Sequence, residues 1–225
     1  MATLVGRESD VFRLGAAWGA ATRGRCALVL LAGAAGIGKT SLAGETERLA
    51  AATGGTVLRA RCRPGERSMS LRPLVDALGP RLAARWAGGQ TAHEAVAGAV
   101  RGAAADRPVL LVLDDLHHAG LATVELLRGL LDGSRTRLLV IAAVRTPEGD
   151  PTLDALAAVA TRLDVGPLPP PAVAQLAADA GHAAAAAPVR ERTGGHPLFV
   201  AEALRALSRR RASGVPGERP AHAGG

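Results

Sequence analysis

The segment GAAGIGKT at residues 33–40 has the spacing of a phosphate-binding loop. Its fixed positions are Gly33, Gly38, Lys39 and Thr40, which fit the pattern G-x-x-x-x-G-K-S/T. Glycines at this spacing let successive backbone N–H groups face an anion, and the N-terminus of the following helix adds its positive dipole. The pattern therefore predicts a site for the phosphates of a nucleotide.

Lys39 is the only lysine among the 27 Lys and Arg residues of the chain. An ammonium group is a compact charge whose three donors rotate freely, whereas a guanidinium group is a wider and rigid fork. We therefore predict that Lys39 reaches the β- and γ-phosphates of a nucleotide in a space that is too narrow for arginine.

The whole loop and the first turn of the following helix are expected to contact the nucleotide. The predicted contact residues are Gly33, Ala34, Ala35, Gly36, Ile37, Gly38, Lys39, Thr40 and Ser41. Thr40 has a second predicted role, because the hydroxyl group at this position of the pattern binds Mg²⁺.

A second apolar segment, PVLLVLDD at residues 108–115, ends in two acidic residues. A phosphate-binding loop predicts an apolar strand that ends beside the loop in an acid, and this acid holds Mg²⁺ through water. We assign this role to Asp114, and we assign Asp115 to orient or polarise the attacking water. The alternative is that both are solvated carboxylates at a strand end. We do not expect a metal site at His117 and His118, because adjacent side chains on one turn diverge.

Arg145 ends a third apolar segment, RLLVIAAVR at residues 137–145. Ligands of open α/β sheets lie beyond the carboxyl ends of the strands, which is where this arginine is expected. We predict that Arg145 senses the γ-phosphate or stabilises its developing charge. The alternative is a solvated arginine, since arginine is abundant in this chain.

Apolar runs of strand length alternate with helical patterns through the first three quarters of the chain. The predicted strands cover residues 26–33, 56–62, 108–115, 137–145 and 161–168. The predicted helices cover residues 10–22, 39–52, 71–86, 91–104, 121–132 and 152–160. Continuous apolar strands that alternate with helices are typical of a parallel sheet covered on both faces. We therefore predict an α/β fold, a P-loop NTPase core over residues 1–168 with a parallel sheet flanked by helices.

The pattern changes at Pro169, after which helix-like segments are separated by Pro and Gly and no strand pattern occurs. We interpret residues 169–211 as a small helical lid subdomain. Residues 212–225 are rich in Gly and Pro, and this composition predicts a disordered tail.

The chain has 225 residues, 48% of them hydrophobic, and a formal net charge of +7. Its arginines are scattered and mostly lie near acids, so we expect solvated faces and no direct contact with DNA. Two cysteines provide no disulfide framework. The N-terminus has no signal-peptide pattern, and no apolar run approaches ~18–20 residues. We therefore expect a cytoplasmic protein without a membrane partner.

Several segments together resemble the STAND-type AAA ATPase domain of the AAA+ superfamily, which is found in large LuxR-type bacterial transcriptional regulators. The segments that carry the resemblance are LVGRE (4–8), LLAGAAGIGKTSL (30–42), VLRARC (57–62), LVLDDLHHA (111–119), VR (144–145) and TGGHPLFVAEALRAL (193–207). The resemblance covers about residues 3–208.

The resemblance implies that Val5, Gly6 and Arg7 line the adenine and ribose pocket. It also implies that His196 and Pro197 bring the helical lid against the nucleotide. Such domains work as switches, in which ADP holds a closed form while ATP and an inducer open it and permit self-association. We therefore expect ATP and ADP as ligands, Mg²⁺ as cofactor, weak ATPase activity, and contact with DNA only through a domain outside this sequence.

The sequence departs from the family pattern LDDLHWAD at His118 and Gly120, where Trp and Asp are usual. We expect the missing acid to affect the rate of ATP turnover more than the binding of ATP. One alternative is a dedicated P-loop enzyme, a kinase or mechanical ATPase, but residues 169–211 fit the AAA lid better than a kinase lid. Another is an interaction or DNA-binding module, which would leave the lysine and both acids unexplained.

Overall fold

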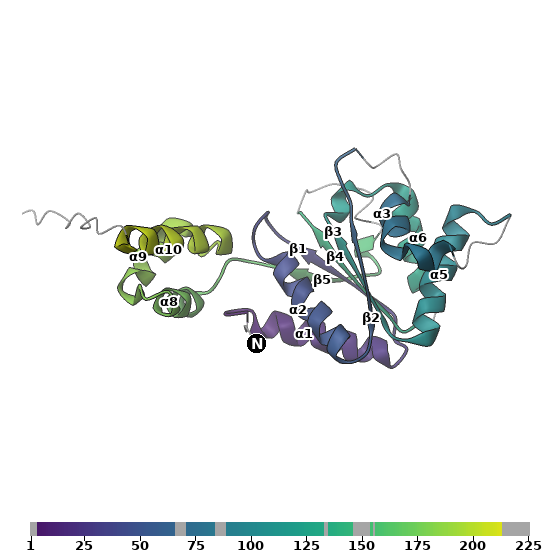
Figure 1. Ribbon diagram of the computed structural model, residues 1–225, viewed down its shortest axis with the longest axis horizontal. Helices are drawn as coiled ribbons and strands as arrows, with labels where there is room; N and C mark the ends of the chain where they lie inside the picture. Colours follow the sequence, from purple (N-terminus) through teal and green to yellow (C-terminus); the bar gives the residue numbers. More distant parts are fainter. Residues whose placement is uncertain are drawn as a thin grey trace, which may run out of the picture. The chain divides into compact units, whose positions relative to one another are not determined.

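Five strands of the computed structural model form a parallel sheet in the order β2–β3–β4–β1–β5 (Figure 1). Their bounds are β1 (Ala27–Ala32), β2 (Thr56–Arg61), β3 (Val109–Asp114), β4 (Leu138–Val144) and β5 (Thr161–Asp164). The structure describes residues 4–65, 71–83, 89–132, 135–145, 154 and 156–212. The predicted α/β class is confirmed, and each predicted strand contains one observed strand.

β4 lies between β1 and β3, and it is hydrogen-bonded to both. β3, the strand that ends in the predicted acid, is therefore separated from β1 by one strand. Apolar runs identify strands but do not order them, because β1, β3 and β4 are all buried on both faces and read alike. All strands run in the same direction, so the carboxyl ends of these three still meet at one edge of the sheet.

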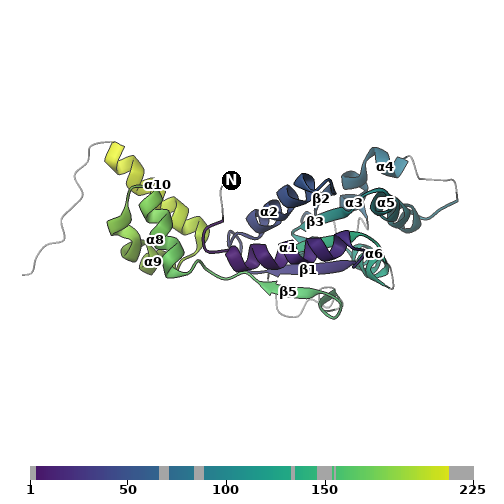
Figure 2. The ribbon, with the colours of Figure 1, turned by 90° about the horizontal axis from the view of Figure 1, so that it is seen from below.

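Helices cover both faces of this sheet (Figures 1 and 2). α1 (Glu8–Thr22) and α2 (Lys39–Ala52) pack on one face. α3 (Arg72–Leu78), α5 (Ala92–Asp106) and α6 (Leu121–Leu131) pack on the other. The two layers of helices leave the carboxyl edge of the sheet free to carry a site.

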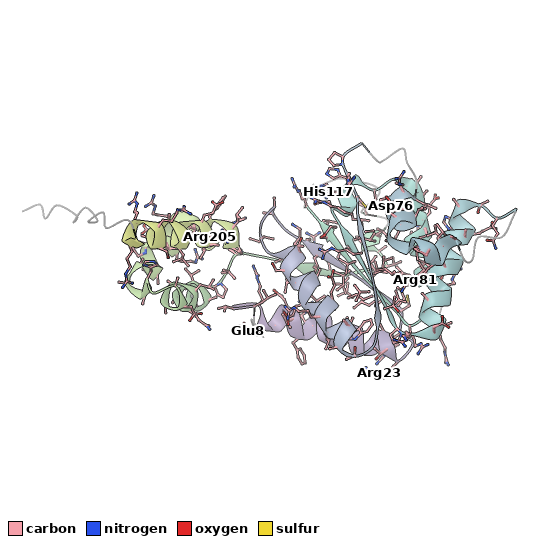
Figure 3. The ribbon with its side chains drawn as sticks, viewed as in Figure 1. Glu8, Arg23, Asp76, Arg81, His117 and Arg205 are labelled. Atoms are coloured by element: carbon pink, nitrogen blue, oxygen red, sulfur yellow. The ribbon has the colours of Figure 1, made fainter. Side chains whose placement is uncertain are left out.

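Alternate residues of the strands build the core beneath α3, α5 and α6 (Figure 3). Leu28, Leu111 and Leu113 are examples from β1 and β3, and each is at most 1% exposed. Val96 and Leu127 meet them from α5 and α6. Burial of each such side chain contributes about 1.5–3 kcal/mol, so leucine and valine can hold this fold with very few aromatic residues.

The segment predicted as one helix over residues 71–86 contains two helices, α3 and α4 (Pro80–Ala83). Gly79 separates them with φ 47° and ψ −125°, which is not helical geometry. Pro80 cannot donate the backbone hydrogen bond that would continue the first helix. The apolar spacing continues across this break, which explains why the pattern alone predicts a single helix. Residues 84–86 lie outside the described residues.

In the predicted helix over residues 152–160, positions 154, 156 and 157 are helical, whereas 158 and 159 form a turn. The remaining positions up to 155 lie outside the described residues. The predicted helix at 91–104 is confirmed as α5. Its N-terminus has a capping box, in which Thr91 and Glu94 bond each other's backbone N–H groups.

The chain divides into two compact units. The sheet unit comprises Arg7–Gly166, and the helical unit comprises residues 4–6 together with 167–212 of the described chain. The helical unit contains α8 (Pro170–Asp179), the short 3₁₀ helix η3 (Ala183–Ala185), α9 (Ala186–Thr193) and α10 (Pro197–Ala212). Its own core includes Val173, Val189 and Val200. The predicted tail, apart from residue 212, lies outside the described residues.

No helix of the described chain is both long enough and apolar enough to cross a membrane.

Trp18 connects α1 to the turn that follows α2. Its side chain is 2% exposed, and its indole Nε1 donates a hydrogen bond to Thr53 Oγ1 at 3.0 Å. We expect Trp18→Ala to lower the free energy of unfolding by about 3–5 kcal/mol, because it leaves a cavity between the two helices. Phe12→Ala on the same helix removes a side chain that is 77% exposed, and it should cost less than about 0.5 kcal/mol. Equal losses in urea titrations followed by circular dichroism would contradict this packing.

Candidate functional site

The loop at residues 33–38 is anchored where it leaves β1. Gly33 N donates to Val144 O at 3.3 Å, and on the other side Val165 N donates to Ala32 O at 2.7 Å. A Cβ atom on Gly33 would lie 2.6 Å from Val165 O, so the first glycine of the motif is required by the chain that follows β5. Gly38 is the N-cap of α2. Its φ angle of 104° is one that residues with a side chain rarely adopt.

Lys39 is folded into this loop. Its Nζ donates to Gly33 O at 2.7 Å and to Ala34 O at 2.8 Å, and the residue is 8% exposed. Burial lowers the pKa of Lys39 below its usual value, and the charge of Arg145 lowers it further, while the carboxylates at the end of β3 oppose both effects. The ammonium group thus occupies a narrow space bounded by backbone carbonyls.

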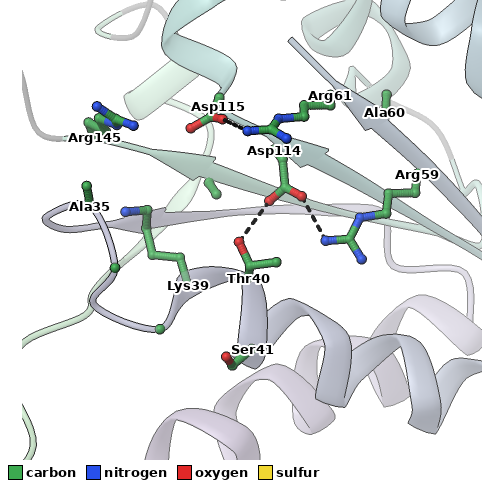
Figure 4. Close-up of a pocket in the computed structure, with 13 residues that line it drawn as sticks. Ala35, Lys39, Thr40, Ser41, Arg59, Ala60, Arg61, Asp114, Asp115 and Arg145 are labelled. Carbon is green, nitrogen blue, oxygen red and sulfur yellow. Dashed lines mark hydrogen bonds and ion pairs between the residues drawn. The ribbon is translucent and has the colours of Figure 1, made fainter. Parts of the chain in front are cut away.

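Asp114 and Asp115 line the same cavity, although consecutive strand residues normally point to opposite faces. Asp115 breaks this alternation with φ 55° and ψ 43°, a left-handed conformation that Asp adopts more readily than most residues. Thr40 Oγ1 donates to Asp114 Oδ1 at 3.4 Å, which joins the start of α2 to the end of β3 (Figure 4).

The cavity has a volume of about 710 Å³. Its lining residues are Ala35, Gly36, Gly38, Lys39, Thr40, Ser41, Arg59, Ala60, Arg61, Asp114, Asp115, Ala143 and Arg145. The structure therefore brings together the predicted loop, both predicted acids and the predicted arginine, which come from three distant segments of the sequence. Four cationic side chains face two carboxylates there, a balance that favours an anionic ligand.

Thr40 and Asp114 also fit a magnesium ion by their chemistry. A hydroxyl and a carboxylate are hard oxygen donors, and Mg²⁺ binds through one or two carboxylates together with phosphates and water. The described residues contain no group of three or more His, Cys, Asp or Glu that could form a metal site made only of protein side chains.

His117 lies beside the site and contacts the backbone of one of its residues (Figure 3). It is 9% exposed, and its Nδ1 accepts a hydrogen bond from Arg145 N at 3.5 Å. Burial lowers the pKa of His117, and the neighbouring charges of His118, Arg145 and Lys39 act in the same direction against Asp115. A neutral His117 ring therefore joins the end of β4 to the turn after β3.

Two charged lining residues, Arg59 and Arg61, were not among the predicted site residues. Both come from β2, where they alternate with the buried Leu58 and Ala60 and so share one face of the strand. Arg59 pairs with Asp114 at 2.7 Å, and Arg61 lies 3.4 Å from the Asp115 carboxylate. The alternation in TVLRARC was the available signal, but only the pairing of β2 with β3 reveals what the arginines face.

Arg7 belongs to the sheet unit and is 8% exposed. Its guanidinium group donates to Ile37 O at 3.1 Å and to Gly166 O, and it lies 3.6 Å from Asp10. Burial lowers the pKa of Arg7, an effect that Asp10 opposes. Arg7 thus holds the backbone of the phosphate-binding loop, and its implied contact with adenine or ribose stays a prediction.

The other residues implied by the resemblance lie in the helical unit. Val5 packs against the core of this unit, and Gly6, with φ 73°, runs close to α8. The His196 ring lies 4.6 Å from the Phe199 ring, and Pro197 is the first residue of α10. Their predicted approach to a nucleotide stays a prediction.

A parallel sheet flanked by helices, with this loop between β1 and α2, defines the fold of a P-loop NTPase. Residues 3–141, more than half of the chain, match the family model of the AAA ATPase domain. The chain belongs to this family. No curated protein matches the sequence.

Solved structures share this fold at low sequence identity. ORC2 from Aeropyrum pernix, solved in ADPNP–ADP complexes, has a TM-score of 0.64 and 16% identity over 92% of this chain and 63% of its own. RuvB from Thermotoga maritima has a TM-score of 0.56 and 20% identity over 93% and 62%. A STAND protein with a tetratricopeptide repeat sensor from Pyrococcus horikoshii has a TM-score of 0.54 and 18% identity over 97% and 33%. The chain thus spans less than two thirds of each of these proteins.

Two glycines near α2 are expected to respond to alanine in opposite directions. Gly33→Ala forces a Cβ atom against Val165 O and should lower the free energy of unfolding by about 1–3 kcal/mol. Gly44 lies within α2, and a Cβ atom added there would have no atom within 4 Å apart from its chain neighbours and the backbone of the helix itself. Gly44→Ala should therefore raise the free energy of unfolding by about 0.5–1 kcal/mol, because alanine favours a helix more than glycine does. Chemical denaturation of both variants checks this, and a neutral effect of Gly33→Ala would show that the loop is not held against the chain after β5.

Proposed function

We propose that this chain is an ATP-binding switch domain of the STAND type that hydrolyses ATP slowly. The observation that supports this proposal is the convergence of a phosphate-binding loop, two carboxylates and an arginine on one cavity. A loop with exposed backbone at a helix N-terminus binds phosphate in any P-loop protein. The carboxylates and the arginine are the additional groups that phosphoryl transfer to water requires.

Each residue of the site has a role in this proposal. The backbone of residues 33–38 and the ammonium group of Lys39 bind the phosphates, while Thr40 and Asp114 hold Mg²⁺. When bound, Mg²⁺ neutralises charge on the phosphate oxygens. Asp115 orients the attacking water and accepts its proton, and Arg145 stabilises charge on the γ-phosphate.

Slow hydrolysis is supported by the surroundings of Asp115. Its carboxylate lies 3.4 Å from the guanidinium group of Arg61, and this ion pair competes with an attacking water for the carboxylate oxygens. His118 and Gly120 also stand where the family usually has Trp and Asp. A domain that retains ATP for a long time suits a switch better than an enzyme of rapid turnover.

The wider setting follows from the resemblance. A LuxR-type transcriptional regulator would use this domain to couple ATP and an inducer to self-association in the cytoplasm, and would contact DNA through another domain. Val5, Gly6 and Arg7 would bind the adenosine part of ATP or ADP. His196 and Pro197 would carry the response of the helical unit to the nucleotide.

Lys39 gives the most direct test of nucleotide binding. We expect Lys39→Ala to weaken ATP binding by roughly 10–100-fold, since a hydrogen bond to a charged group contributes about 1.5–3 kcal/mol. Lys39→Arg should also weaken ATP binding, because the guanidinium group of arginine does not fit between the loop carbonyls. Calorimetric titration with ATP measures both. Wild-type affinity in Lys39→Arg would contradict the geometric role of the lysine.

Asp115 separates hydrolysis from binding. We expect Asp115→Asn to bind ATP within about twofold of the wild type but to hydrolyse it at least roughly 10²-fold more slowly, because the amide cannot accept the proton of water. Phosphate release at saturating ATP provides the rate. A wild-type turnover well above ~1 s⁻¹ without partners would favour a dedicated enzyme over a switch.

A further inference from the structure

Arg59 bridges two carboxylates beside the site. Its Nη2 donates to Asp114 Oδ2 at 2.7 Å. Its Nη1 lies 3.1 Å from one oxygen of Glu47 and donates to the other at 3.2 Å. Both ends of the guanidinium fork are therefore engaged, and Figure 4 shows the end that is bound to Asp114.

The second carboxylate comes from the helix that begins at the phosphate-binding loop. Glu47 follows Thr40 by seven residues in α2, which is about two turns and places both on one face of the helix. Thr40 contacts Asp114 Oδ1, and Glu47 reaches Asp114 through Arg59. Thr40, Asp114, Arg59 and Glu47 thus form a ring of contacts that is closed by α2 and connects this helix to β2 and β3.

The ring determines how the Asp114 carboxylate is turned. One oxygen is occupied by Arg59, and the other faces Thr40. Asp114 and Glu47 are 14% and 20% exposed, whereas Arg59 is 42% exposed, so solvent screens part of these interactions. A ligand carboxylate whose second oxygen is hydrogen-bonded presents its first oxygen in a fixed direction.

Glu47 also sets the charge of the ring. A guanidinium group alone would cancel the negative charge of Asp114 and weaken its attraction for a cation. The carboxylate of Glu47 compensates Arg59, so the three side chains together keep one negative charge. Arg59 can therefore orient Asp114 without neutralising it.

We propose that Arg59, held and compensated by Glu47, is a positioning residue that turns Asp114 toward Thr40 and so prepares the magnesium site. This inference rests on the proposed function of the site, because it concerns how the metal-bound nucleotide is retained. Arg59 acts through Asp114 and needs no contact with the nucleotide.

The experiment compares the affinity of the full chain for a non-hydrolysable ATP analogue in Mg²⁺ and in EDTA. In the wild type, Mg²⁺ should tighten binding. Arg59→Met should reduce this magnesium-dependent gain by about tenfold, a typical effect of losing a residue that orients a metal ligand. Affinity in EDTA should stay within about twofold, because the phosphate loop is untouched. Arg48→Met, which removes the exposed Arg48–Glu45 pair of α2, should change neither value.

A double-mutant cycle tests the compensation by Glu47. Glu47→Gln should reduce the magnesium-dependent gain in the wild type but have no further effect in Arg59→Met. Additive effects of the two substitutions would overturn the proposal, as would equal losses with and without Mg²⁺, which would mark Arg59 as a phosphate ligand or a structural residue. If the wild type binds no nucleotide, the proposed function itself fails. Circular dichroism melting curves of each variant establish that it is folded.

Discussion

The phosphate-binding loop takes its position from β1, a strand that is hydrogen-bonded along both edges. Pairing continues past the strand, since Gly33 bonds to the end of β4 and Ala32 to the start of the segment after β5. Arg7 adds a third support by bonding Ile37 O. A loop that binds an anion through its backbone must hold its N–H groups in place, and here neighbouring backbone provides that constraint.

The charges around the loop follow from the same arrangement. Because β3 and β4 run parallel to β1, the residues at and directly after their ends, Asp114, Asp115 and Arg145, meet at the edge where the loop lies. β2 then places Arg59 and Arg61 against the two carboxylates. The site therefore has more cations than acids, and each acid is oriented by a cation from the next strand.

Much of this could be predicted from the sequence, because the strongest signals are local. The glycine pattern of residues 33–40 specifies its own turn, and the long apolar runs mark buried strands wherever they lie. α2 begins and ends where the spacing of its apolar residues predicts. The break at Gly79 is local too, but the apolar spacing continues across it and conceals it.

Features that depend on strand order or on partners far along the chain could not be predicted in this way. Nothing in the composition of β4 indicates that it separates β1 from β3. The contact of Arg59 with Glu47 and Asp114 joins residues that are 12 and 55 positions apart. The hydrogen bond from Arg7 to Ile37 O joins residues that are 30 positions apart, and it depends on how α1 is placed. Such contacts follow from the packed sheet and not from any single segment.

The central claim is that the edge of this sheet binds one nucleotide through its phosphates. Calorimetric titration of the unmodified chain with ATP, ADP and AMP in the presence of Mg²⁺ tests it most directly. We expect one site per chain and an affinity that falls from ATP and ADP to AMP, because the loop and Lys39 bind the β- and γ-phosphates. Equal affinity for all three nucleotides, or no binding of ATP at millimolar concentration, would contradict it.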